Sequence, residues 1–96
     1  MTIEFHPDVA EDISEAVRRY DPVSPLLTEQ FLAELRWLLA VAARNPGRFH
    51  LVAKGFRRAN LRRFPYHFLY RETDDGIRVI SVKHHRRDPA HGMDRR

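Results

Sequence analysis

The stretch from Asn60 to Pro89 decides the fold, and it reads NLRRFPYHFLYRETDDGIRVISVKHHRRDP. Two runs rich in Tyr, Phe, Ile and Val, at residues 66–71 and 77–82, flank a short acidic segment that ends in Asp75 and Gly76. This pattern predicts a β-hairpin, because Gly adopts positive φ freely and Asp tolerates it better than most residues. We therefore expect Asp75 and Gly76 to form a two-residue loop.

That loop sets the pairing of the two strands. It places Thr73 opposite Arg78 and Tyr66 opposite His85. The basic residues before the first strand, at 62–63, and those at the end of the second then lie at the same end of the hairpin. The sequence therefore predicts a polybasic, histidine-bearing pocket on a rigid platform.

Charge is divided unevenly along the 96 residues, whose net charge is +4. Residues 1–47 carry four arginines and eight acidic residues, for a net charge of −4, whereas residues 48–96 carry 13 Lys and Arg and five acidic residues, for a net charge of +8. Only Lys54 and Lys83 are lysines, so the basic half presents guanidinium groups, which bind phosphate oxygens in pairs and stack on bases. The two halves are expected to face different partners; the alternative is an Arg-rich surface that is merely solvated.

The N-terminal half predicts one strand and two helices. Apolar and polar side chains alternate over residues 2–6, as in a half-buried strand. Residues 7–20 carry acidic residues at the start and arginines at the end, an arrangement that the helix dipole favours. Ser24 can cap a second helix that runs to about Arg44. Its main apolar stripe comprises Leu27, Phe31, Leu35, Leu38 and Ala42. Trp37 and Val41 lie on the opposite side, where the neighbour is either the first helix or a segment of a partner protein.

The remaining segments predict further strands and a loose end. Residues 48–53 read as a strand or an irregular approach to one, residues 54–55 as a turn, and residues 56–64 as a strand with a polar binding face. The tail, residues 90–96, has no apolar periodicity, so we expect it to fray.

This order of elements predicts the fold class α+β in a single domain spanning residues 1–96. A small, largely antiparallel sheet with the order β-α-α-β-β-β(-β) should carry the helical pair on one face, with the first strand beside a C-terminal strand. The chain should form a core that is adequate but not generous for independent folding.

Composition narrows the function classes. The absence of cysteine excludes disulfides and thiolate metal sites. Adjacent His84 and His85 should point to opposite faces of a strand, so we expect neither a metal site nor a cofactor. There is no signal-peptide pattern and no apolar run near the roughly 18 residues of a membrane span, and the expected location is the cytoplasm.

The segments RRFPYHFLYR and IRVISVKHHRRDP, with the acidic turn between them, resemble the C-terminal half of toxins of the RelE/ParE superfamily. The resemblance implies the toxin of a type II toxin–antitoxin system, which inhibits growth and is neutralised by a small acidic DNA-binding antitoxin in a hetero-oligomer. It also implies one of two targets, because some members of the superfamily cut ribosome-bound messenger RNA and others poison DNA gyrase.

The resemblance to RelE-like nucleases supplies candidate catalytic residues for a metal-independent endoribonuclease. Arg62 matches the arginine before the hairpin, and His85 matches an Arg or His at the exit of the last strand. His91 stands where such nucleases often place a tyrosine. The wider set expected to bind a target or phosphate is Arg58, Arg63, Tyr66, Lys83, His84, Arg86, Arg87 and His91. A ParE-like inhibitor without catalysis, and an RNA-binding or structural module without toxicity, are the other classes that the sequence leaves open.

Overall fold

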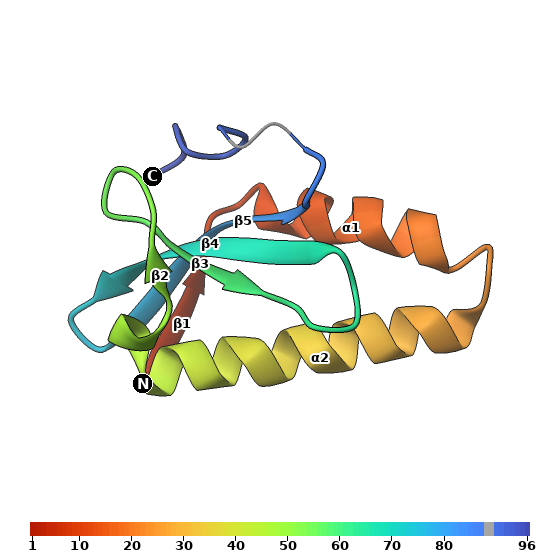
Figure 1. Cartoon of the computed structure of the whole chain (residues 1–96), viewed down its shortest axis with the longest axis horizontal. Coiled ribbons are helices and arrows are strands. Elements are labelled where there is room, and N and C mark those ends of the chain that lie inside the picture. Colours follow the sequence, from red (N-terminus) through yellow and green to blue (C-terminus); the bar gives the residue numbers. More distant parts are fainter. Residues whose placement is uncertain (88–89) are drawn as a thin grey trace.

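A computed structural model describes residues 1–87 and 90–96. The elements in this part of the chain are β1 (Thr2–Phe5), α1 (Val9–Tyr20), α2 (Pro25–Arg44), the 3-10 helix η1 (Pro46–Arg48), β2 (His50–Leu51), β3 (Arg57–Asn60), β4 (Tyr66–Thr73) and β5 (Gly76–His84). The five strands form one sheet in the order β1-β5-β4-β3-β2, and only the β1–β5 pair is parallel (Figure 1). The expected α+β class is confirmed, as is the position of the first strand beside a C-terminal one.

The hairpin is present, but its loop and register differ from the expected ones. Thr73 pairs with Gly76 and Tyr66 pairs with His84, so the loop consists of Asp74 and Asp75. Neither aspartate has positive φ, so the Asp-Gly turn predicted from the sequence is wrong. A register shift between Leu69 and Tyr70 changes the pairing by one residue, because Leu69 pairs with Ser81 whereas Tyr70 pairs with Val79.

Gly76 is needed for a different reason than the turn. A Cβ atom at this position would lie 1.9 Å from the backbone oxygen of Thr2, because β1 passes directly beside it. Thr2 also pairs with Gly76 in the parallel ladder, and its amide donates to the carbonyl of Asp75 at 2.8 Å. The glycine therefore permits the close approach of the N-terminal strand to the hairpin.

Both helices lie over one face of the sheet, as expected. The Oγ of Ser24 accepts the N–H of Leu26 at 3.2 Å, and Pro25 occupies the first turn of α2. Helix α1 begins at Val9, two residues later than predicted. In the part of the chain that is described, neither helix is long and apolar enough to cross a membrane.

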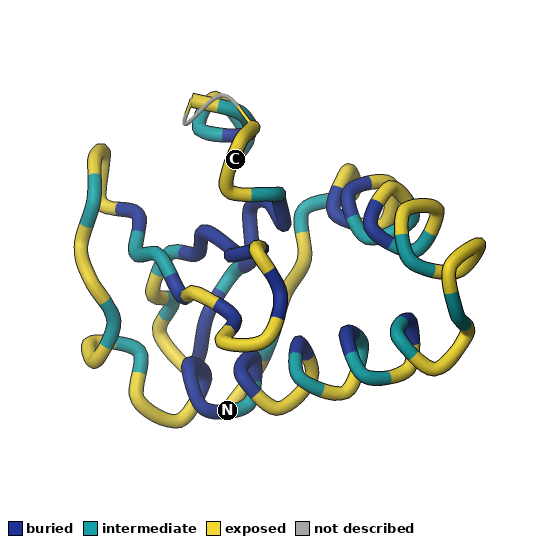
Figure 2. Tube along the Cα trace, turned by 45° about the vertical axis from the view of Figure 1, so that its right-hand side comes forward, coloured by how far each residue is buried: buried dark blue, intermediate teal, exposed yellow. Residues whose placement is uncertain are grey.

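The core lies between the helices and the inner face of β4 and β5. The α2 residues Phe31, Leu35, Leu38 and Ala42 are buried, as the helical stripe predicts. Figure 2 shows buried positions recurring along one side of the helices. On the other side of α2, Val41 is buried near η1, whereas Trp37 is 56% exposed. The first helix therefore does not cover Trp37.

An aromatic cluster ties the β3–β4 loop to the two helices. It consists of Tyr20, Phe31, Phe64 and Tyr66, whose ring centroids lie 5.1 to 6.1 Å apart in the pairs that touch. Four of these five pairs have the edge-to-face geometry that aromatic rings favour, and the Tyr20–Phe31 pair is tilted. The cluster fixes the start of β4 relative to α1 and α2.

The strands before the hairpin are shorter than predicted. Only two residues of the expected 48–53 strand pair with a neighbour, and the expected 56–64 strand is limited to β3. The turn at Lys54 and Gly55 is confirmed, since both residues have positive φ. Leu61 to Pro65 form a loop because the amides of Arg62 and Arg63 bond to a helix rather than to a strand.

The C-terminal tail is docked rather than frayed, which differs from the expectation. The guanidinium of Arg95 donates to Asp12 of α1 at 2.7 Å and to the carbonyl of Ile80 at 3.0 Å. Arg78 donates to the carbonyl oxygen of Arg96 at 2.8 Å. Sequence periodicity misses these contacts because they are made by polar groups and not by an apolar stripe.

Candidate functional site

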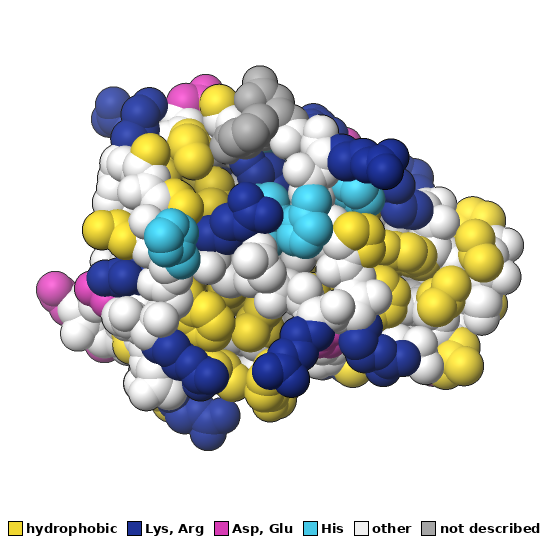
Figure 3. Space-filling view, viewed as in Figure 1, with side chains coloured by type: hydrophobic (Ala, Val, Ile, Leu, Met, Phe, Trp, Pro, Cys, Tyr) yellow, Lys and Arg dark blue, Asp and Glu magenta, His cyan; other side chains and the backbone are white. Residues whose placement is uncertain are grey.

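A cleft of about 640 Å³ lies between α1 and the end of the hairpin. It contains six of the ten predicted site residues, which are Tyr66, Lys83, His84, Arg86, Arg87 and His91. The other residues that line it are Asp12, Glu15, Arg19, Pro65 and Val82. The cleft is polybasic and bears histidines, as predicted, but it is formed by the strand exit without Arg62 and Arg63, which the prediction included. The face shown in Figure 3 carries Lys, Arg and His side chains across it.

Two of the acidic groups at the cleft already have cationic partners. Arg87 donates to Glu15 at 3.2 Å, and Asp12 accepts from Arg95 at 2.7 Å. Among residues 1–87 and 90–96, the guanidinium groups of Arg19 and Arg86 have no carboxylate partner. The cleft thus keeps two positive charges that no acidic group of the described chain offsets.

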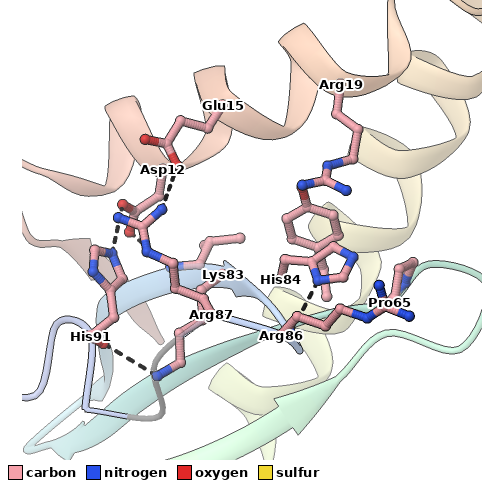
Figure 4. A pocket seen from close by; sticks show the side chains of 11 residues that line it. Asp12, Glu15, Arg19, Pro65, Lys83, His84, Arg86, Arg87 and His91 are labelled. Carbon is pink, nitrogen blue, oxygen red and sulfur yellow. Dashed lines mark hydrogen bonds and ion pairs between the residues drawn. The ribbon is translucent and has the colours of Figure 1, made fainter.

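His84 lies between these two arginines (Figure 4). Its Nδ1 accepts the backbone N–H of Arg86 at 3.1 Å, so we assign the ring proton to Nε2. Its ring stands edge-on to Tyr66, with centroids 5.1 Å apart. Burial lowers the pKa of His84, and the charges of Arg19 and Arg86 lower it further. His84 is therefore a neutral hydrogen-bond donor near pH 7.

Tyr66 supplies a hydroxyl to the same cleft. Burial raises the pKa of Tyr66, and the positive charge of Arg19 partly opposes that rise. A tyrosine hydroxyl that keeps its proton can donate one hydrogen bond and accept others. Arg19 and Tyr66 therefore both contribute donors to the cleft.

A second cluster joins Arg58, His67 and His85. The His67 and His85 rings stack with centroids 5.1 Å apart, and their Nδ1 atoms are 2.9 Å apart. Arg58 Nη2 lies 3.4 Å from the same Nδ1 of His85. Since Tyr66 and His67 are neighbours on β4 and contact His84 and His85 respectively, the two histidines lie on opposite faces, as predicted.

The ionisation of this cluster follows from burial and charge. His67 is only 2% exposed, and burial together with Arg58, Lys83, His85 and His84 lowers its pKa to about 3. Burial and Arg58 also lower the pKa of His85. Both imidazoles are neutral near pH 7.

The hydrogen bonds then assign the tautomers. Arg58 is always a donor, so Nδ1 of His85 acts as the acceptor, and Nδ1 of His67 donates to it. The proton of neutral His85 therefore resides on Nε2. Since Nδ1 of His67 carries the proton, its Nε2 is an acceptor; this atom is buried and has no hydrogen-bond partner in the described chain.

Arg62 and Arg63 lie outside both of these clusters, beside α2. Their backbone amides both donate to the carboxylate of Glu34 on α2, and Arg63 also approaches Gln30 with a donor–acceptor distance of 3.5 Å. Arg62 lines a small cavity with Trp37 of α2. The predicted catalytic residues Arg62 and His85 therefore lie in different clusters, and within the described part of the chain their side chains make no hydrogen bond with each other.

The sequence-based set lacked several residues of these sites, among them Arg19, Glu34, His67 and Asp12. Arg19 was interpreted only as a favourable charge at the end of a helix, and Glu34 and His67 had no distinguishing pattern. Asp12 was expected only to favour the start of the same helix. For Asp12, its position on the apolar side of α1, three residues after Val9 and four before Ala16, is the signal that could have indicated burial. Where the chain is described, no three His, Asp or Glu side chains group closely enough to hold a metal ion.

Comparisons with known proteins agree with this architecture. A family model described as the ParE toxin of the type II toxin–antitoxin system, parDE, matches residues 3–89. The fold is similar, with a TM-score of 0.75, to a structure of a chromosomal ParDE toxin–antitoxin system from P. aeruginosa. That match has 16% sequence identity and covers 88% of this chain and 95% of the other. No curated protein matches the sequence.

Proposed function

Because the chain belongs to the ParE toxin family of type II toxin–antitoxin systems, we propose that it inhibits growth by binding DNA gyrase rather than by cutting RNA. The observation that carries the choice is the separation of Arg62 from His85. Metal-free RNA cleavage needs a base for the 2′-hydroxyl and a cation for the developing phosphorane at one scissile phosphate. Here the candidate cation and the candidate base belong to different clusters.

The tautomer of His85 gives independent support. A general base needs a free lone pair within reach of the proton that it removes. Nδ1 of His85 already faces the His67 and Arg58 donors, and Nε2 carries the proton. A neutral N–H of this kind has no lone pair for a 2′-hydroxyl, and its lowered pKa disfavours the imidazolium form that would act as an acid.

The proposed cellular partner is an acidic antitoxin. The cationic residues of the C-terminal half offer long-range attraction to an acidic segment, and the exposed Trp37 on α2 offers an apolar anchor for it. We place this partner, a small acidic DNA-binding protein, in a cytoplasmic hetero-oligomer with the toxin. Such a complex should raise the melting temperature of this small domain by mass action.

Expression of the chain alone, followed by measurement of gyrase and of messenger RNA, tests the proposal. Gyrase binding predicts DNA damage, filamentation and loss of supercoiling by purified gyrase, with intact ribosome-bound messages. The His85→Gln variant should keep full toxicity, since glutamine retains size and hydrogen bonding but cannot exchange a proton near pH 7.

The nuclease alternative makes the opposite prediction. In that case Arg62→Ala and His85→Gln should each lower the cleavage rate by about a hundredfold or more. Cuts in ribosome-bound messages that disappear in the His85→Gln variant would refute the gyrase proposal. Arg36→Gln, at an exposed α2 position outside all three clusters, serves as the matched control.

A further inference from the structure

The cleft beside α1 has more hydrogen-bond donors than its own side chains can use. Arg19 and Arg86 lack carboxylate partners within residues 1–87 and 90–96. His84 presents Nε2–H, because its Nδ1 is occupied by the Arg86 amide. Tyr66 lines the same cleft, and burial raises its pKa, so its hydroxyl keeps a proton that it can donate.

These donors reach the cleft from separate parts of the fold. Arg19 extends from α1 towards His84, whereas Arg86 follows β5 and extends towards Pro65 (Figure 4). Tyr66 stands on β4 against the His84 ring. Donors from different directions suit an ion with oxygens on several sides, and the two guanidinium groups suit a doubly negative one.

From this arrangement we infer that the cleft is a binding site for a phosphate group, held by Arg19, Tyr66, His84 and Arg86. Phosphate presents tetrahedrally placed acceptor oxygens, whereas a carboxylate offers two in one plane. Glu15 does not compete for the site, since it is paired with Arg87. The inference concerns the isolated chain and does not depend on gyrase as the target.

Isothermal titration of the whole chain with inorganic phosphate, at constant ionic strength and pH 7.5, tests the site. We expect saturable binding at one site per chain, and Arg19→Gln should weaken it about tenfold or more, as loss of a charge-assisted hydrogen bond implies. The matched control is Arg18→Gln, which removes the same charge from the neighbouring position of α1, where Arg18 pairs with Glu11 at 2.7 Å. It should leave the affinity within about twofold, because the contribution of a distant exposed charge is largely screened.

Equal weakening by Arg18→Gln and Arg19→Gln would overturn the inference, because it would show diffuse attraction rather than a site. Tyr66→Phe removes only one oxygen and should weaken phosphate binding without unfolding the core, so it tests the site even if Arg19→Gln folds poorly. Unchanged affinity in Tyr66→Phe would remove the hydroxyl from the site and contradict the assignment.

Two further probes define the ligand. Acetate should bind far more weakly than phosphate, and acetate binding of equal strength would overturn the preference for phosphate. Adenosine 5′-monophosphate should bind to the site, whereas adenosine should not. This result would show that the site accepts a phosphate ester as well as the free ion. Equal binding of adenosine would show that the base, and not the phosphate, is recognised.

Discussion

Replacing Asp12 by alanine measures how strongly one buried carboxylate holds the fold together. Its side chain is 5% exposed, and its Oδ2 accepts the Val82 amide at 3.0 Å and Arg95 Nη1 at 2.7 Å. Strand β1 pairs with β5 only as far as Phe5 and Val79. The edge of β5 at Val82 lies beyond this last pair, and the Asp12 carboxylate binds the Val82 amide there. The carboxylate thus replaces a missing strand neighbour.

The expected loss follows mainly from the two donors at Oδ2, the Val82 amide and Arg95, which the substitution leaves without this acceptor. A buried N–H without a partner costs about 1–3 kcal/mol. Removal of one member of a buried ion pair costs about 3–5 kcal/mol, but Arg95 keeps a 14% exposed side chain and can turn to water. We therefore expect Asp12→Ala to lower the free energy of unfolding by about 3–4 kcal/mol, a large part of the 5–15 kcal/mol typical of a domain.

Urea unfolding followed by circular dichroism gives the measurement, and three companion variants divide the effect. Asp12→Asn keeps an acceptor for the Val82 amide and should cost less than Asp12→Ala. A double-mutant cycle between Asp12→Ala and Arg95→Ala should give a coupling energy of about 1–3 kcal/mol. The control is Glu11→Ala, on the same helix in an exposed pair, which should change stability by less than about 1 kcal/mol. A loss below about 1 kcal/mol for Asp12→Ala, or zero coupling to Arg95, would refute the role of this carboxylate.

Three further predictions concern the sheet and the core. Gly76→Ala should cost about 1–3 kcal/mol and speed amide exchange in β1, because the new Cβ would meet the Thr2 oxygen at 1.9 Å; an unchanged urea midpoint would contradict this. Leu35→Ala should cost about 2–5 kcal/mol by leaving a cavity under α2, while exposed Arg86→Ala should not, and equal losses would show that the α2 face is misplaced. His67 is buried in its neutral form with a pKa of about 3, so below about pH 6.5 the unfolded chain takes up a proton that the folded chain does not. From this group alone, the free energy of unfolding should therefore fall by about 2 kcal/mol between pH 7 and pH 5. His67→Gln should lose correspondingly less over that interval, and an identical pH profile would argue against a neutral His67.

Apolar patterns were sufficient to predict the layers of this fold. Leu35 and Leu38 fall at helical spacing on one side of α2, and both are buried. The apolar side chains of the hairpin segments likewise predicted two strands, because successive side chains of a strand point to opposite faces and a buried face requires apolar ones. These signals are carried by many residues, so an error at one position does not remove them.

Register and site geometry depend on single atoms, and sequence patterns did not predict them. The pair Asp75–Gly76 has the composition of a tight turn, yet the glycine serves the approach of Thr2 from 74 positions earlier in the chain. The basic residues do gather at one end of the hairpin, but the Glu34 carboxylate directs the Arg62 segment to α2 and stacking on His67 holds His85 elsewhere. A partner that is distant in sequence decides each of these positions.

The parallel pairing of β1 with β5 also sets the order in which the protein can be completed during synthesis. The Thr2 hydroxyl donates to Asp75, which lies 73 positions later, so the first strand has no ladder partner until the hairpin has been made. At about 5–20 residues per second, that interval lasts on the order of 4 to 15 seconds. Both helices leave the ribosome before the sheet can close. Translation therefore leaves both helices without a closed sheet during this interval.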